Sequence, residues 1–523
     1  MHAPALLIRN TTYIAGAGTP HQSGVDIFIA DGLIAAIGEN LMDTPEVAAA
    51  KPRVIDGSRR LALPGFINAH THSNESFAQG FWDAMPLEVW LLHIYPPFTM
   101  KRMPERFHYL RTMLLAIESV RSGVTTVQDD LINKMGDVEA FDGPAAAYRD
   151  IGLRAAITTS MGDRQLLEPI PWTDEIMSPG MKAELATLPF RKAAELIQTF
   201  HRHSEKWNGA GDGRIRVILG PIGPQWCTDE LLQEATQISL ARGLPVHTHT
   251  LESKLQAVQA QYLYGCTMIE HLDRIGVLTP NFTLNHAIWL TDSDIELIGA
   301  RGCSMSHNPL SNLKLGSGIA RIRAMKNAGV NVALGTDGTS TSDRADMYRS
   351  LGMASLLQRA GDMDYETWVT ADEAFEMATM GSARSCGLGQ EIGRIEVGRR
   401  ADIQLIDKQD YGLIPFYNPI SQLAYAVNSD AVRSVIVNGV LIMDERRLTQ
   451  IDEDAIKDEM IDVAEAYVRD NMPEKEKMAA KYLPFYRALH MRAARTDIPA
   501  SHAPVRLSCG CMPAPLRHTF TCD

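Results

Sequence analysis

Two histidines separated by one residue, His70-Thr71-His72, follow the apolar run of residues 61–67 directly. Side chains alternate across a β-strand, so the two imidazoles project to the same face. At the carboxyl end of a barrel strand, this geometry presents two ring nitrogens to one metal ion. The spacing therefore favours a fold in which a strand end carries part of a metal site.

Two further apolar runs also end in residues that bind metals. They are Val246-His247-Thr248-His249 and Ala333-Leu334-Gly335-Thr336-Asp337. Zinc and ferrous iron bind neutral imidazole and carboxylate, and a hydrolytic site usually leaves one position to water. We therefore predict one divalent metal ion, zinc in the first place and iron as the alternative. Its predicted ligands are His70, His72, His249 and Asp337.

Each of these ligands has an alternative interpretation. The first histidine pair could be a structural pair near a strand end, and Asp337 an ordinary turn aspartate. His247 competes with His249. We favour His249, because it ends the strand and precedes a polar turn, and we expect His247 to face the barrel wall or a neighbouring helix.

Hydrolysis by an activated water also requires groups that transfer protons. Glu252 falls three residues after His249, and His286 follows the apolar segment 281–284. We predict that Glu252, His286 and Asp337 are the catalytic residues. The alternatives are a helix N-terminal glutamate favoured by the helix dipole and a hydrogen-bonded core histidine.

Short apolar strands alternate with longer helical patterns from about residue 65 to 390. This alternation favours an α/β fold with a parallel sheet, most simply a (β/α)8 TIM-type barrel. Strand patterns in residues 1–64 and 391–450 could pair into one small β-sandwich domain built from both termini; the second includes residues 393–406. Residues 451–523 are predicted to form a charged helical extension and a poorly ordered tail.

The composition excludes several classes of protein. The 523 residues are 45% hydrophobic, enough for a large core and more than one domain. The net charge of -13 argues against general nucleic-acid binding. No segment approaches the ~20 apolar residues that span a bilayer, and the N-terminus lacks the pattern of a signal peptide. Seven scattered cysteines suggest reduced thiols, so we expect a cytoplasmic enzyme without a membrane partner.

Together these motifs resemble the amidohydrolase superfamily, in the branch of nucleoside, guanine and cytosine deaminases and triazine hydrolases. The resemblance covers roughly residues 5–445. It implies a (β/α)8 barrel with a composite β-sandwich, the same four ligands, and proton transfer by Glu252 and His286. Members of this superfamily often assemble, so we expect a homo-oligomer. The segments that carry the resemblance are residues 63–72, 85–91, 123–126, 249–252, 306–315 and 393–403.

Three departures from relatives bear on the metal and the substrate. Binuclear members bridge two metals through a lysine or glutamate on a middle strand, and residues 216–222 contain neither. Thr99 stands where members acting on S-adenosylhomocysteine or methylthioadenosine have a ribose-binding glutamate, and Ile222 replaces a histidine that lines the substrate. A single metal and a substrate smaller or more apolar than a nucleoside are therefore favoured. Aromatic residues that could line a flat pocket are Trp82, Trp90, Tyr95, Phe98 and Trp226.

These observations predict a mononuclear metal-dependent hydrolase that cleaves a C–N bond of a small molecule, first of all by deaminating a nitrogen heteroaromatic. Removal of a substituted amine or halide from a triazine-like ring is an alternative, and hydrolysis of an aromatic amide or urea is another. A rival interpretation is a catalytically silent scaffold. It is disfavoured because such chains generally lose ligands, whereas this chain keeps every expected ligand and proton-transfer residue.

Overall fold

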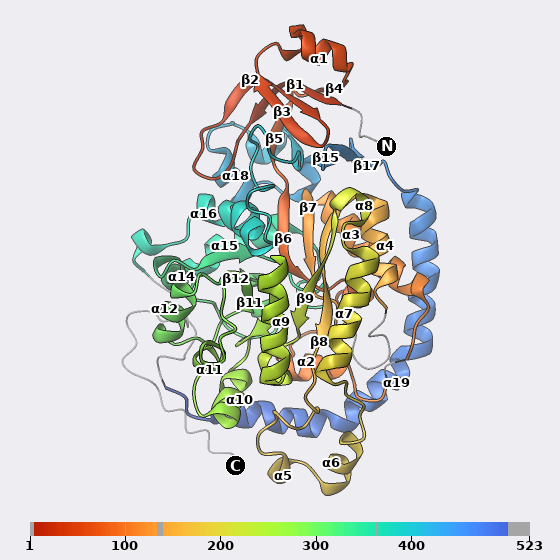
Figure 1. Cartoon of the computed structure of the whole chain (residues 1–523), viewed down its shortest axis with the longest axis vertical. Helices are drawn as coiled ribbons and strands as arrows, with labels where there is room; N and C mark the ends of the chain where they lie inside the picture. The colour runs from red at the N-terminus through yellow and green to blue at the C-terminus, as the bar shows by residue number, and fades with distance from the viewer. Residues whose placement is uncertain (1–4, 100, 133–139, 361–362, 500–523) are drawn as a thin grey trace.

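The computed structural model describes residues 5–99, 101–132, 140–360 and 363–499 (Figure 1). The poorly ordered tail predicted for the last two dozen residues, with Cys509, Cys511 and Cys522, lies outside the described residues. In the described part of the chain, no helix combines the length and apolar character needed to cross a membrane.

An eight-stranded parallel sheet forms the centre of the molecule (Figure 1). Its strands lie side by side in chain order, and helices between them cover its outer face, which confirms the predicted (β/α)8 barrel. The strands are β6 (Phe66–Thr71), β7 (Val124–Asp129), β8 (Arg154–Met161), β9 (Ile215–Pro221), β10 (Val246–Thr250), β11 (Phe282–His286), β12 (Ser304–His307) and β13 (Asn331–Leu334).

Several helices around the barrel begin at a residue whose side chain accepts a hydrogen bond from a backbone amide of the first turn. In α9 (Asp229–Arg242), the Thr228 hydroxyl accepts a hydrogen bond from Leu231 N, and Gly243 ends the helix at φ 62°. The other helices are α1 (Pro45–Ala50), α2 (Leu87–Ile94), α3 (Glu105–Arg121), α4 (Asp142–Ile151), α5 (Thr173–Ile176), α6 (Pro179–Leu185), α7 (Ala193–Trp207), α8 (Ala210–Gly213), α10 (Lys254–Tyr264), α11 (Met268–Arg274), α12 (Asp292–Ala300), α13 (Pro309–Lys314), α14 (Ile322–Asn327), α15 (Met347–Arg359), α16 (Ala371–Glu376), α17 (Ser382–Ser385), α18 (Pro419–Tyr425) and α19 (Glu453–Arg495).

The barrel closes where its last strand meets its first. The Asp337 amide donates a hydrogen bond to the His70 carbonyl at 2.9 Å. One residue earlier, the Thr336 amide donates to Asn68 Oδ1 at 3.0 Å, and the Asn68 side-chain amide donates to the Thr336 hydroxyl at 2.8 Å. These three bonds fix the segment after β13 against the carboxyl end of β6.

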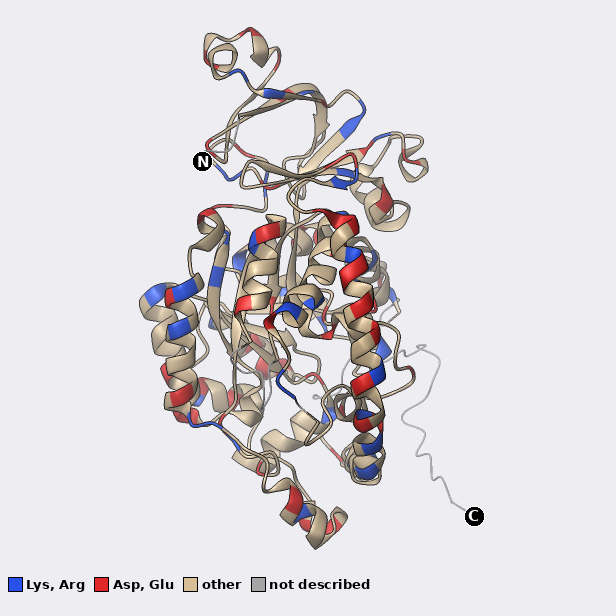
Figure 2. Ribbon diagram, turned by 90° about the vertical axis from the view of Figure 1, so that its right-hand side faces the viewer, with Lys and Arg blue, Asp and Glu red and all other residues tan. Residues whose placement is uncertain are grey.

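A nine-stranded, mostly antiparallel sheet sits at one end of the barrel (Figure 2). Ala62 of β5 pairs with Leu405 of β14, so both ends of the chain contribute to this domain. The sheet packs around its own apolar cluster, which includes Ile27 and Ile436. Its strands are β1 (Leu6–Tyr13), β2 (Gln22–Ala30), β3 (Leu33–Gly38), β4 (Arg53–Asp56), β5 (Arg60–Pro64), β14 (Ile403–Asp407), β15 (Val432–Val437), β16 (Val440–Asp444) and β17 (Arg447–Leu448).

The strand predicted over residues 393–406 is much shorter in the structure. Only Ile403–Asp407 forms a strand, while residues 393–402 are irregular. Gly393 and Gly398 adopt φ 90° and 89°, a left-handed backbone that a continuous strand does not accommodate. The apolar and β-branched residues of this segment gave the strand pattern, and the two glycines broke it.

The longest helix, α19, runs along one side of the barrel and then across the end where the barrel strands finish (Figure 1). It contacts α2, α10 and α5. Two prolines inside it, Pro473 and Pro484, lack the amide hydrogen that the helix needs, and they allow it to bend around the barrel. A helix from the C-terminal part of the chain therefore covers the carboxyl end of the barrel.

The Arg154–Asp402 ion pair links the barrel to the β domain, and its loss should destabilise the protein. Arg154 Nε donates to Asp402 Oδ2 and Arg154 Nη2 donates to Asp402 Oδ1, each at 3.1 Å, and the two side chains are 3% and 2% exposed. Asp402→Ala leaves a buried arginine unpaired, so we expect a loss of about 3–5 kcal/mol in unfolding free energy by denaturant titration. Asp470→Ala, which breaks the exposed Arg469–Asp470 pair, is the control and should cost less than about 1 kcal/mol. Equal losses of unfolding free energy in the two variants would contradict a stabilising role for the buried Arg154–Asp402 pair.

Candidate metal centre

Four side chains from three strand ends converge at the carboxyl end of the barrel. His70 lies in β6 and His72 directly follows it, His249 lies in β10, and Asp337 follows β13. All four are buried or nearly so. The atoms that face one another are the Nε2 atoms of the three histidines and Asp337 Oδ1.

Three separations between these atoms are close to those expected around one tetrahedral metal ion. Asp337 Oδ1 lies 3.5 Å from His70 Nε2 and 3.1 Å from His72 Nε2. His72 Nε2 and His249 Nε2 lie 3.2 Å apart. Ligand atoms about 2.0–2.1 Å from a tetrahedral zinc ion are about 3.3–3.4 Å from each other. His70 Nε2 is buried and has no hydrogen-bond partner among the described residues, as expected of an atom that binds a metal.

The other ring nitrogen of each of the three histidines, Nδ1, has a hydrogen-bond partner. His72 Nδ1 lies 2.6 Å from the Asp130 carbonyl, and His249 Nδ1 lies 2.9 Å from the Ile222 carbonyl. A backbone carbonyl accepts the Nδ1 proton, which leaves the Nε2 lone pair free. The neighbouring strands therefore orient both rings toward the centre of the site.

His247 is placed differently from the prediction. It does not face the barrel wall or a helix: its Nε2 lies 2.8 Å from His70 Nδ1, inside the barrel. The expectation was wrong because residues 247 and 249 alternate with 248 on the strand and so share one face. His247 occupies the Nδ1 of His70 and is itself hydrogen-bonded to Gln128. His247 therefore orients the ring of the predicted ligand His70 and does not take the place of His249.

Two hydrogen bonds hold the Asp337 carboxylate in place. Its Oδ1 accepts a hydrogen bond from the Gly338 amide at 2.7 Å, and its Oδ2 accepts one from the Ser311 hydroxyl at 2.5 Å. Burial raises the pKa of Asp337, but the imidazoles of His70 and His72 beside its carboxylate outweigh burial and hold that pKa well below its usual range. Its backbone has φ 66°, and that of His286 has φ 71°. Left-handed non-glycine residues are uncommon and gather at functional sites.

Glu252 and His286 lie beside the four convergent atoms. His286 Nε2 is 3.7 Å from Glu252 Oε2 and 4.0 Å from Asp337 Oδ2. His286 Nδ1 donates to Asn312 Oδ1 at 2.9 Å, so Nε2 is left as an acceptor facing the site. Burial, with the nearby carboxylates of Asp337 and Glu88, raises the pKa of Glu252 well above its usual value, and burial lowers that of His286. Burial thus favours the protonated form of the Glu252 carboxyl and the neutral form of the His286 imidazole.

The structure brings all six predicted residues together and adds others that the sequence analysis missed. Glu75, buried three residues after His72, accepts hydrogen bonds from Ser340 at 2.6 Å and from the Tyr95 hydroxyl at 3.0 Å. Its spacing from the histidine pair was the available signal. Ser311 and Asn312 lie in the segment 306–315, which was noted for its resemblance but given no chemical role.

A pocket of about 70 Å³, which we call the metal pocket, opens onto these side chains. Ile222 lines it, while the Thr99 hydroxyl turns to the Pro96 carbonyl at 2.9 Å and does not reach it. Neither residue offers a polar group to a sugar. The pocket is lined by His72, Glu75, Leu87, Trp90, Leu91, Ile132, Ile222, Gln225, Trp226, His249, Glu252, Gln256, His286, Leu315 and Asp337.

Residues 61–442 match the family model described as the amidohydrolase family. The chain belongs to the amidohydrolase family. It is a metal-dependent hydrolase of the deaminase type, as the sequence predicts, and members of this family typically bind a divalent metal.

Several known proteins are similar to this chain over most of their length. A 5-methylthioadenosine/S-adenosylhomocysteine deaminase of Syntrophobacter fumaroxidans is 34% identical over 82% of this chain and 90% of its own. A 5'-deoxyadenosine deaminase of Methanosarcina barkeri is 31% identical over 84% and 93%. Among solved structures, a zinc-bound adenosine deaminase from Xanthomonas campestris superposes with a TM-score of 0.76 at 27% identity, covering 90% of this chain and 98% of its own. A zinc complex of an atrazine chlorohydrolase from Arthrobacter aurescens TC1 gives 0.77 at 25%, covering 88% and 100%.

The approach of β13 to β6 leaves no room for a side chain at Gly335, which gives a direct test of the site's construction. A Cβ there would lie 2.4 Å from Asn308 Oδ1 and 2.9 Å from the His70 backbone N and O atoms. Gly335→Ala should therefore lower the unfolding free energy by about 1–3 kcal/mol. Gly180→Ala, where a Cβ meets nothing within 4 Å, is the control and should be neutral or slightly stabilising. A thermal shift for Gly335→Ala no larger than the control's would contradict this packing.

Proposed function

We propose that this amidohydrolase removes an amino group from a nitrogen heteroaromatic ring by hydrolysis, with one zinc ion held by His70, His72, His249 and Asp337. The observation that carries the proposal is the convergence of four ligand atoms, 3.1–3.5 Å apart where measured, beside Glu252 and His286. The zinc-bound structures of similar proteins support zinc over iron. Homo-oligomeric assembly and a cytoplasmic location stay predictions of the sequence.

The metal would supply a water of lowered pKa and an electrostatic partner for the charge that develops on it. The chain's own residues handle the protons. Glu252, with its raised pKa, donates a proton to a ring nitrogen and makes the adjacent carbon electrophilic. His286 Nε2 and Asp337 Oδ2 share the first proton of the attacking water and return it to the departing amine. The second water proton passes to Glu252 as the amine leaves, which restores the protonated carboxyl. The carbon gains an oxygen and loses the amine, which leaves as ammonia when it is unsubstituted.

The ring amines of the related deaminases suggest the first substrates to examine, namely aminopurines. The sugar contacts must differ, because Ile222 and the turned-away Thr99 give no polar group to a ribose. A second candidate, displacement of an amine or halide from a triazine-like ring, is favoured by the similarity to the chlorohydrolase and by the leucine and tryptophan side chains of the metal pocket.

The ligand assignment predicts the metal content of variants. The purified protein should hold about one zinc per chain by elemental analysis, as a four-ligand mononuclear site requires. His72→Ala removes one of the convergent nitrogens, so its zinc content should fall well below one. His21→Ala, at an exposed histidine of the β domain, is the matched control and should keep the metal. Full occupancy in His72→Ala, or two ions per wild-type chain, would contradict the assignment.

Glu252→Gln separates proton donation from metal binding. The amide is similar in size but cannot give a proton, so kcat for deamination should fall by roughly 10²–10⁴-fold while zinc content stays at the wild-type level. Glu230→Gln, on the exposed surface of α9, should leave both unchanged. Turnover at the wild-type rate by fully loaded Glu252→Gln would remove Glu252 from the mechanism.

A further inference from the structure

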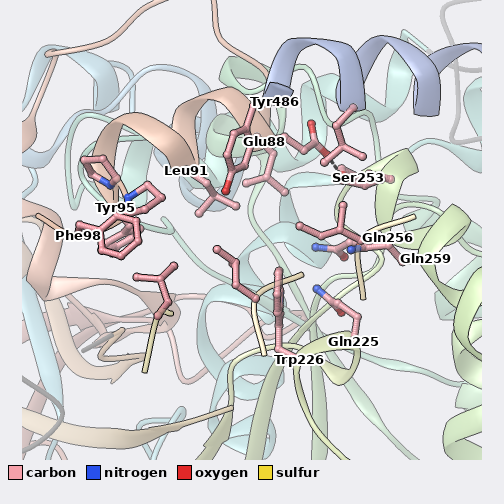
Figure 3. Close-up of a pocket in the computed structure, with 18 of the residues that line it drawn as sticks. Glu88, Leu91, Tyr95, Phe98, Gln225, Trp226, Ser253, Gln256, Gln259 and Tyr486 are labelled. Carbon is pink, nitrogen blue, oxygen red and sulfur yellow. Dashed lines mark hydrogen bonds between the residues drawn. The ribbon is translucent and has the colours of Figure 1, made fainter. Parts of the chain in front are cut away.

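A second cavity of about 230 Å³ lies directly outside the metal pocket, and we call it the outer chamber (Figure 3). The two spaces share five lining residues, so a molecule whose ring reaches the metal pocket can extend into the chamber. The shared residues are Leu87, Leu91, Gln225, Trp226 and Gln256.

The walls of the outer chamber are mainly apolar. Tyr486 reaches into it from α19, facing Trp226 on the opposite side, while Leu91 and Phe98 close one flank (Figure 3). The remaining apolar lining comes from leucines, prolines and an isoleucine, among them Leu166, Ile170, Leu188, Leu255 and Leu489. No lysine or arginine of the described chain lines the chamber.

Glu88 is the one carboxylate among the described lining residues, and both of its oxygens are engaged. Oε1 accepts a hydrogen bond from the Ser253 hydroxyl at 2.6 Å, and Oε2 lies 2.9 Å from His490 Nδ1. The Glu88 side chain is 7% exposed. Both carboxylate oxygens of Glu88 are therefore bound by protein side chains and are not available to a ligand. An anionic ligand would lie near this carboxylate, and no lysine or arginine among the described lining residues would compensate its charge.

The part of the chamber wall formed by α19 lies beyond residues 61–442, which carry the family match. The helix is anchored over the barrel at several points. Besides the Glu88–His490 contact, Lys475 Nζ donates to the Ile94 carbonyl at 3.0 Å, and Lys254 Nζ donates to the Ala494 carbonyl at 2.9 Å. Tyr486 and Leu489 are thus held in place by contacts to α2 and to α10, whose residues line the metal pocket or flank it.

We propose that the outer chamber binds an uncharged, apolar substituent of the substrate, aromatic or branched aliphatic, and that Tyr486 and Leu489 help to select it. This inference rests on the proposed ring-amine hydrolysis for the position of the ring. The size supports it, because an apolar cavity of about 150 Å³ takes up benzene. An uncharged substituent larger than a methyl group therefore fits both the volume and the apolar lining of the chamber.

Three substrates that share the adenine ring test the preference through ammonia release by zinc-loaded enzyme: 9-methyladenine, 9-benzyladenine and 9-(4-carboxybenzyl)adenine. Burying the benzyl group should raise kcat/KM over the methyl compound by roughly 10- to 100-fold. The carboxylate should abolish most of that gain. A methyl preference, or equal rates for the neutral and charged benzyl compounds, would overturn the proposal.

Variants of the chamber should change the preference and leave the chemistry intact. Leu166→Trp fills the space, and Tyr486→Ala removes part of its wall. Both should keep kcat/KM for 9-methyladenine and the zinc content, and both should lower the benzyl-to-methyl ratio by roughly tenfold. The controls are Leu240→Trp and Tyr262→Ala, at exposed positions of α9 and α10. An unchanged ratio in both chamber variants would overturn the proposal.

A binding measurement keeps the test independent of turnover. N-phenyl-1-naphthylamine and 8-anilino-1-naphthalenesulfonate share one ring skeleton, and only the second carries a charge. We expect saturable fluorescence binding of the neutral probe at one site per chain, weakened by Leu166→Trp but not by Leu240→Trp, and weaker binding of the sulfonate. This result without any deamination would refute the proposed function and retain the chamber. Absence of binding, or equal binding by Leu166→Trp, would overturn the chamber proposal.

Discussion

The hydrogen bond from the Asp337 amide to the His70 carbonyl joins the last strand of the barrel to the first, and the site depends on it. Residues 70 and 337 are far apart in the chain, yet this bond brings the carboxylate of one within 3.5 Å of the ring of the other. Gly335 allows the approach, since any side chain there would collide with His70 and Asn308. Closure of a parallel barrel places the carboxyl ends of all strands at one face. The contact between β6 and the segment after β13 then sets the distance between the Asp337 carboxylate and the histidine rings.

Burying so many polar groups is unfavourable unless each has a partner. The far nitrogens of the histidines have partners in carbonyls and in His247, but His70 Nε2 and His286 Nε2 have none among the described residues. A metal ion and a substrate or water are the natural partners of these two atoms. The left-handed backbone at His286 and Asp337 adds strain at the same place, so folding energy from the surrounding core maintains a site prepared for ligands.

The sequence was sufficient to predict the barrel, because strand and helix patterns alternate with short connections. It also singled out six candidate residues that the structure brings together, because each lies at or shortly after the end of a strand. It misplaced His247, although the alternation of side chains on a strand already gave its direction. It did not assign Glu75, Ser311 or Asn312, since their roles arise from contacts between segments distant in the chain. The prediction of a strand over residues 393–402 was wrong because the left-handed backbone of two glycines, and not the apolar pattern, determines the conformation of that segment.

The outer chamber was equally beyond the reach of sequence patterns. Its walls come from α2, the loops after β8 and β9, α10 and the far end of α19, and no local motif announces that these meet. Of the five aromatic residues noted in the sequence, Tyr95 and Phe98 line the chamber, Trp90 lines the metal pocket, and Trp226 lines both. The fifth, Trp82, is not a lining residue of either space. Specificity in this protein thus depends on how a helix outside the family-matched region is laid over the barrel.

The most direct test of the metal centre is X-ray diffraction from crystals of the zinc-loaded protein, with anomalous data at the zinc edge. Our account predicts a single anomalous peak about 2.0–2.2 Å from His70 Nε2, His72 Nε2, His249 Nε2 and an Asp337 carboxylate oxygen. A second group of potential ligands, His70, Asp130 and His247, lies in the barrel below. A peak at that group, or two peaks of comparable height, would contradict the account.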